Sequence, residues 1–203
     1  MLKSFHLSTY IMKILVITLG DDMYHLTLQM NARLQPITRG ELFEDIISEV
    51  LEAHEIGGVD GGGTMLQKSG EIDFCDVEIF LNEKTEENLK LLLEIISELD
   101  VPKGSKLYGE NVEYKVGTVE GLALYLNGTD LPDKVYKKCD INHVIEKIDE
   151  LLDEEGAYYS YWEGPSDTAL YFYGASFDRM KKLMEPFLEE YPLCEKCRVV
   201  QIA

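Results

Sequence analysis

The chain has 203 residues, enough for one large domain or two small ones, and its 45% apolar and 28% charged residues are typical of a folded globular protein. Its 38 acidic side chains against 19 basic ones, a net charge of -19, exclude a protein whose main task is to bind nucleic acid phosphates. No apolar stretch is long enough to span a bilayer, so we expect neither nucleic acid nor a membrane among its partners.

The first residues show no secretory signal. Residues 1–11 lack a long apolar stretch, so we expect a cytoplasmic protein and interpret them as an N-terminal extension, with Met12 as an alternative start. The apolar run Lys13–Leu19 predicts a buried strand. The next segment, Met23–Leu34, fits the helical and the strand period equally well, so its structure stays open.

A glycine-rich segment follows the first predicted helix. Thr38 and Glu41 form a capping-box pattern that predicts the start of this helix. Beyond it, Gly57–Thr64 holds five glycines in seven positions, which lets the backbone approach a ligand closely. The segment matches no nucleotide-binding motif, and it leads from a helix into a strand. We predict a flexible or tightly turned joint. The less favoured alternative is a ligand loop that uses Asp60, Gly61, Gly62 and Gly63.

The segments Thr64–Gln67 and Glu71–Leu81 predict a hairpin that turns at residues 68–70, and its second strand is acidic. Alternation places Glu71 and Asp73 on one face, and Asp76 and Glu78 on the other. Such carboxylates could hold a hard cation, but their spacing is not that of a calcium loop. We therefore favour a solvated or partner-facing surface and keep Glu71 and Asp73 as candidate binding residues.

Two further elements complete the first half. Thr85 is placed to cap a helix that carries apolar residues up to Leu99. An edge strand is predicted around Val112–Val116. Residues 12–117 then have the order β-α-β-β-α-β, which is that of a ferredoxin-like unit.

The second half repeats this order. Its predicted elements are the strand Gly121–Asn127, a helix capped by Asp140, the strands Tyr158–Trp162 and Thr168–Tyr173, a helix capped by Ser176, and the strand Arg198–Ile202. The predicted fold class is α+β, with two tandem ferredoxin-like (βαββαβ) units packed together, 12–117 and 118–203. The match lies in the element order and not in the residues themselves. Because the first and third strands of such a unit are neighbours in the middle of its sheet, we expect Ile14–Leu19 beside Glu71–Leu81 in one sheet, and Gly121–Asn127 beside Thr168–Tyr173 in the other.

Aromatic residues gather in the hairpin of the second half. A period of two predicts Tyr158 with Trp162 on one face, and Tyr159 with Tyr161 on the other. Outward rings could stack RNA bases, but residues 118–203 hold 17 acidic and only 9 basic side chains. We predict that the hairpin packs against the other unit or a dimer mate. The alternative is a partner or ligand site formed by Tyr159, Tyr161 and Trp162.

The cysteines are expected to be inert. Cys194 and Cys197 form a C-x-x-C pair that follows Pro192 and leads into a strand, so no helix N-terminus stabilises a thiolate. Zinc would need two more ligands, and Cys75 and Cys139 belong to no second pair. We expect no metal and no cofactor.

No nucleophile–base pair can be argued from residue spacing, and both halves are acidic. We hypothesise a non-enzymatic, acidic binding protein, of the inhibitor or immunity type, that masks a basic partner. One alternative is a sensor that binds a small molecule between the two units. Another is an enzyme with its site at Gly57–Thr64 and the acidic strand. A homodimer is compatible with the sequence.

Overall fold

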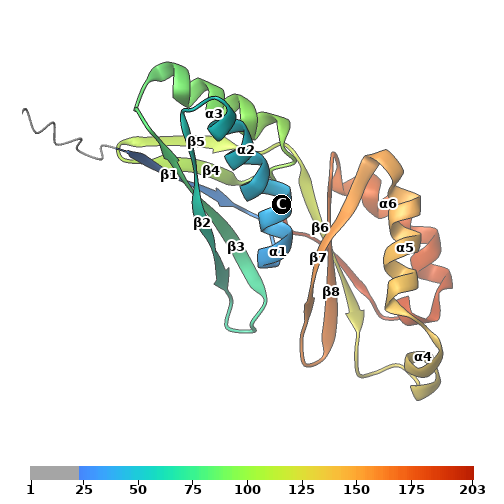
Figure 1. The fold of residues 1–203 in the computed structure, drawn as a ribbon. Coiled ribbons are helices and arrows are strands. Elements are labelled where there is room, and N and C mark those ends of the chain that lie inside the picture. Colours follow the sequence, from blue (N-terminus) through green and yellow to red (C-terminus); the bar gives the residue numbers. More distant parts are fainter. Residues whose placement is uncertain (1–22) are drawn as a thin grey trace, which may run out of the picture.

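A computed structural model describes residues 23–203. The predicted extension 1–11 and the predicted strand Lys13–Leu19 lie outside the described residues. The fold is α+β with two antiparallel sheets of five and four strands, each with helices along one side (Figure 1). Between residues 23 and 203, no helix has both the length and the apolar character needed to cross a membrane.

The first sheet has the strand order β2-β3-β1-β4-β5. Its strands are β1 (Tyr24–Met30), β2 (Gly57–Leu66), β3 (Ile72–Leu81), β4 (Ser105–Gly109) and β5 (Val112–Val116). Its helices are α1 (Pro36–Arg39), a π-helical turn η1 (Gly40–Glu44), α2 (Asp45–Ala53) and α3 (Glu86–Glu98). The first four strands have the spatial order of a ferredoxin-like unit, and β5 extends that sheet at one edge.

The second sheet has the order β7-β8-β6-β9. Its strands are β6 (Glu120–Asn127), β7 (Gly156–Glu163), β8 (Asp167–Gly174) and β9 (Arg198–Gln201). Its helices are α4 (Asp133–Lys138), α5 (Ile141–Leu152) and α6 (Phe177–Glu190), with short 3-10 turns η2 (Asp153–Glu155) and η3 (Pro192–Cys194). The predicted central pair, Gly121–Asn127 beside Thr168–Tyr173, is confirmed.

The segment Met23–Leu34, left open by its pattern, contains the strand β1. It pairs with β3 and β4 and so lies at the centre of the sheet, the place predicted for Lys13–Leu19. Its buried residues alternate along the strand, because one face covers the core. The predicted capping box is wrong: Thr38 lies inside α1, which begins at Pro36, where the fixed φ of proline suits a first helical residue.

The end of the first half contains a hairpin where one edge strand was predicted. β4 pairs with β1, and β5 pairs with β4. The edge strand predicted around Val112–Val116 is confirmed as β5, but the strand before it was missed. The turn between them includes Asn111, which has a φ of 62°. Asparagine tolerates this left-handed conformation better than most residues.

The glycine-rich segment is a strand, not a flexible joint. Gly57–Gly63 belongs to β2 and pairs with β3. Above it, buried Arg39 forms an ion pair with Glu44 and donates hydrogen bonds to the Gly63 carbonyl (2.9 Å) and the Thr64 hydroxyl (2.7 Å). A Cβ on Gly62 would lie 2.4 Å from the Asp76 carbonyl oxygen and 2.8 Å from the Arg39 Nε. The missing side chain therefore allows close packing between this ion pair and the sheet.

The two sheets differ in how their faces are covered. The helix side of the second sheet encloses its own apolar core, which includes Leu124, Phe172 and Val144. Its opposite face packs on the first half: Tyr125 and Tyr171 belong to the same buried cluster as the core of the first sheet. The second sheet is therefore covered on both faces.

We predict that Gly62→Ala destabilises the protein by about 1–3 kcal/mol, because the new methyl group must displace backbone or a buried ion pair. The matched control is Gly63→Ala, whose Cβ would come no closer than 4.0 Å to a neighbouring atom. Urea unfolding monitored by Trp162 fluorescence measures both variants. Equal losses would contradict the close-packing explanation.

Candidate functional site

Glu71, a predicted binding residue, is a buried junction between the two sheets. It lies just before β3 and is only 8% exposed. Its Oε1 accepts hydrogen bonds from the hydroxyls of Tyr125 (2.6 Å) and Tyr171 (2.8 Å), and lies 3.2 Å from the Arg33 guanidinium. The carboxylate therefore joins the two halves and is not free for a partner.

Arg33 extends this junction. Its backbone N–H donates to the Tyr173 hydroxyl (2.8 Å), and its guanidinium donates to the Tyr125 hydroxyl (3.3 Å). The same guanidinium lies 5.6 Å from the centre of the Tyr171 ring. No buried side-chain nitrogen or oxygen within residues 23–203 lacks a hydrogen-bond partner. Mutually bonded side chains thus occupy this part of the interface, where a sensor would hold its ligand.

The tyrosines of the junction keep their protons. Burial, together with the hydrogen bond to Glu71, raises the pKa of Tyr125 to about 12. The same two causes raise the pKa of Tyr171, and burial raises that of Tyr173. Each hydroxyl therefore stays neutral near pH 7, and two of them donate to the carboxylate.

The aromatic side chains of β7 do not alternate between the two faces of the sheet as predicted. A β-bulge between Tyr158 and Ser160 adds one residue to β7. As a result, Tyr158 packs in the core of the second half, whereas Tyr159 and Trp162 pack against the first. The predicted pairing of Tyr158 with Trp162 on one face is wrong for this reason. Tyr161 is 48% exposed.

Polar contacts also bind the hairpin to the first half. The Tyr159 hydroxyl donates to Asp100 Oδ2 (3.2 Å), and the Gln35 side chain donates to the Tyr161 carbonyl (3.0 Å). Trp162 lies near Gly70, at the tip of the β2–β3 hairpin. Of the aromatic candidates, Tyr159 and Trp162 serve the packing of the two halves, and Tyr161 leaves its ring exposed.

The first sheet leaves carboxylates accessible on the face opposite its helices. On this acidic face, which we define by Asp60, Asp76 and Glu78, Thr27 donates to Glu78 Oε2 (3.0 Å) and Gln29 donates to Asp76 Oδ1 (3.1 Å). Neutral donors orient these two carboxylates without cancelling their charge. All three acidic side chains are exposed or half-buried, so the described residues leave them open to a partner.

The glycines that were candidates for a ligand loop lie on different sides of β2. Gly61 and Gly63 lie opposite Glu78 and Asp76 and add no side chain that would cover them. Gly62 lies on the helix side, under Arg39. Asp73 is exposed at the start of β3 and accepts a hydrogen bond from Gln67 (3.0 Å).

The face that carries the acidic residues also carries lysines on β4 and β5, where Lys106 lies opposite Gln29 and Lys115 lies opposite Lys106. Lys106 of β4 pairs with Glu113 of β5 at 3.6 Å and stands over the Tyr108 ring at 4.9 Å. His25 Nδ1 lies 3.8 Å from Asp60 Oδ2, and it carries charge only when protonated. The acidic residues that define this face therefore lie on β2 and β3.

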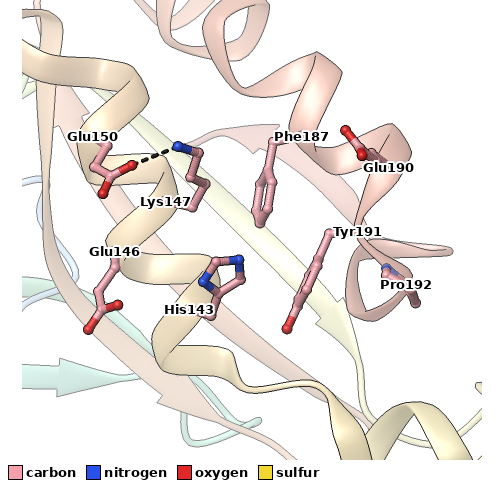
Figure 2. A pocket seen from close by; sticks show the side chains of 8 residues that line it. All are labelled: His143, Glu146, Lys147, Glu150, Phe187, Glu190, Tyr191 and Pro192. Carbon is pink, nitrogen blue, oxygen red and sulfur yellow. Dashed lines mark hydrogen bonds and ion pairs between the residues drawn. The ribbon is translucent and has the colours of Figure 1, made fainter.

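A groove between α5 and α6 is a second candidate, which the sequence did not indicate. It encloses about 590 Å³. It is lined by His143, Glu146, Lys147, Glu150, Phe187, Glu190, Tyr191 and Pro192 (Figure 2). In the sequence, His143 stands out only by its place three residues after Asp140, at the start of a predicted helix. Because the walls come from helices far apart in the sequence, spacing along the chain could not reveal them.

Three rings form the centre of this groove. Phe187 and Tyr191 stack with centroids 5.2 Å apart and an angle of 18°. His143 lies 5.9 Å from the first ring and 5.1 Å from the second. Beside them, the hydrogen bond from Lys147 Nζ to Glu150 (2.7 Å) lowers the pKa of that carboxyl.

Three cysteines share the core of the second half. Cys194 is buried, and Cys139 and Cys197 pack against the same apolar cluster. Burial raises the pKa of Cys194 to about 12 and also raises that of Cys197, which favours the unreactive thiols. From residue 23 onward, no group of three or more histidine, cysteine or acidic side chains is arranged to hold a metal ion.

No protein-family model and no curated protein matches the sequence. The first two RRM domains of the yeast poly(U)-binding protein Pub1 are similar with a TM-score of 0.24 and 11% identity, over 88% of this chain and 99% of that one. A proposed monooxygenase from Lactobacillus acidophilus is similar with a TM-score of 0.31 and 12% identity, over 89% and 94%. Likenesses at these TM-scores support no inference about activity or ligand.

We predict that Glu71→Gln lowers the free energy of unfolding by about 1.5–3 kcal/mol, the range for hydrogen bonds to a charged group. Asp73→Asn removes a charge from an exposed carboxylate nearby and should change stability by less than about 0.5 kcal/mol. Urea unfolding at pH 7 measures both. Equal effects would show that Glu71 does not join the halves.

The raised pKa of Tyr125 predicts alkaline instability. The folded protein keeps this proton up to about pH 12, whereas the ordinary value is 10.0. The folded state thus binds more protons than the unfolded chain between these values, so stability falls as pH rises from 10 to 12. Tyr125→Phe should flatten that slope in urea titrations at each pH, with Tyr161→Phe as the exposed control. An unchanged slope would contradict the role of Tyr125.

Proposed function

We propose that this protein is a non-enzymatic binding protein that takes a basic protein partner on its acidic face. The observation that carries the proposal is the unequal covering of the sheets. The second sheet is covered on both faces, whereas the first leaves Asp60, Asp76 and Glu78 accessible opposite its helices.

The charge on this face suits rapid capture of a cationic surface. The net charge of -19 raises the encounter rate with a basic protein at low salt, and the exposed carboxylates then give local complementarity. Thr27 and Gln29 already hold two of these carboxylates in place, so less side-chain freedom is lost on docking. Half-buried Phe74 and Phe80, on the same strand, supply apolar contact area.

The more specific form of the proposal is an inhibitor or immunity-type protein that masks the basic surface of a toxin or enzyme. Two tandem ferredoxin-like units, 12–117 and 118–203, would form its scaffold, and the shared order of four strands in the two sheets supports this division. The sensor alternative has less support, because Glu71, Arg33 and three tyrosines fill part of the interface between the halves. The enzyme alternative has less support, because Gly57–Thr64 is a paired strand.

The test is a charge-removing double variant, Asp76→Asn with Glu78→Gln. Basic proteins are first captured from a lysate of the source organism at low salt, identified and purified. Their association with the wild-type protein and with the double variant is then measured by stopped flow at low and at physiological salt. We expect the double variant to slow association on the order of 10-fold at low salt, while dissociation changes less.

The matched control is Glu94→Gln with Glu98→Gln, which removes the same charge from exposed positions of α3 on the covered side of the sheet. It should slow association much less, because its carboxylates lie away from the acidic face. Equal slowing by both variants would show a general charge effect without a binding face. Failure to capture any basic protein at low salt would overturn the proposed function.

A further inference from the structure

We infer that the groove between α5 and α6 binds a linear aliphatic polyamine, with its ammonium groups on carboxylates of the two helices and its methylenes on the aromatic rings. This site lies on the second half and shares no residue with the acidic face. The inference therefore does not depend on the proposed function.

The aromatic centre of the groove is held in place before any ligand arrives. Tyr191 stacks on Phe187, four residues earlier in the chain, and its hydroxyl accepts a hydrogen bond from the Asp140 N–H (3.1 Å). His143 closes the cluster from α5. Aromatic faces attract organic cations, and their apolar area also covers methylene chains.

The walls of the groove carry charges that a cation would satisfy. Glu146 and Glu150 project from α5 and Glu190 from α6, so carboxylates lie on both sides of the rings (Figure 2). Lys147, the only Lys or Arg among the lining residues, already pairs with Glu150. Neither Glu146 nor Glu190 forms an ion pair with another described residue. An anion would be repelled here.

The size and shape of the groove favour a ligand with more than one amine. Its volume of about 590 Å³ falls within the range of small-molecule sites, roughly 300–1,000 Å³. A single ammonium group would occupy a small part of it and reach one wall only. A linear polyamine offers an ammonium group to each wall and lays its methylenes on the rings between them.

The experiment titrates the whole protein with spermidine, followed by calorimetry and by NMR shifts of the groove residues. We expect saturable binding with shifts centred on His143 and Tyr191. Butylamine, which has a single amine, should bind at least 10-fold more weakly. Mg²⁺ at equal ionic strength should not displace spermidine, because rings and methylenes contribute nothing to a hydrated metal ion.

Variants separate the groove from general charge. Glu146→Gln with Glu190→Gln should weaken spermidine binding at least 10-fold, and Phe187→Leu about 3-fold or more. The control, Glu185→Gln with Glu189→Gln, changes the same charge on exposed positions of α6 outside the groove and should stay within 2-fold. The glutamate substitutions are all at exposed positions, so they leave the fold intact even if Phe187→Leu does not.

Several results would overturn the inference. Absence of binding at millimolar spermidine, or equal loss in the control variant, would exclude a specific polyamine site. If butylamine binds as tightly as spermidine, the inference that the ligand places an ammonium group on each wall of the groove is wrong. If an N-acetyl-lysine amide with a free side-chain ammonium binds as tightly as spermidine, the groove takes a lysine of a protein partner instead.

Discussion

The arrangement of the two halves depends on one buried carboxylate. Glu71 is almost fully withdrawn from water, and such a charge is tolerated only when hydrogen bonds and an opposite charge replace its hydration. Two of those hydrogen bonds come from Tyr125 and Tyr171 on the second sheet, and the positive charge from Arg33 on the first half. A shift of one half against the other would leave the carboxylate unpaired, so the junction fixes their orientation.

That fixed orientation decides which surfaces remain free. The second sheet presents Tyr125, Tyr171 and Tyr173 to the first half, so its second face is used for packing. The carboxylates on the acidic face of the first sheet stay accessible. The groove between α5 and α6 lies on the helix side of the second sheet, away from the junction. The two candidate sites therefore face solvent from different halves and can act independently.

The alternation of residues along β3 correctly predicted which side chains share a face. The alternation of Asp76 and Glu78 against Val77 and Ile79 placed both carboxylates on the correct face of β3, because one face of that strand is buried. The end of β2 was predicted as a strand, but its glycine-rich part, Gly57–Gly63, was predicted as a joint because glycine disfavours strands. The absence of a side chain at Gly62 is explained by the Arg39 ion pair, which is distant in sequence. The bulge in β7, the pairing of Glu71 with Tyr171 and the rings of the groove all depend on contacts between distant residues, which a single sequence does not show.

A surface that serves only to keep a protein dispersed needs charge but no particular geometry. Here Asp76 and Glu78 are hydrogen-bonded to Gln29 and Thr27, whereas a basic neighbour on the adjacent strand would have added more stability to the isolated fold. Neutral donors leave the full negative charge in place and reduce the side-chain entropy that docking would otherwise cost. The bare backbone of Gly61 and Gly63 beside them keeps both carboxylates accessible from the sheet edge. This combination of fixed orientation, uncompensated charge and open access is what a cationic partner requires.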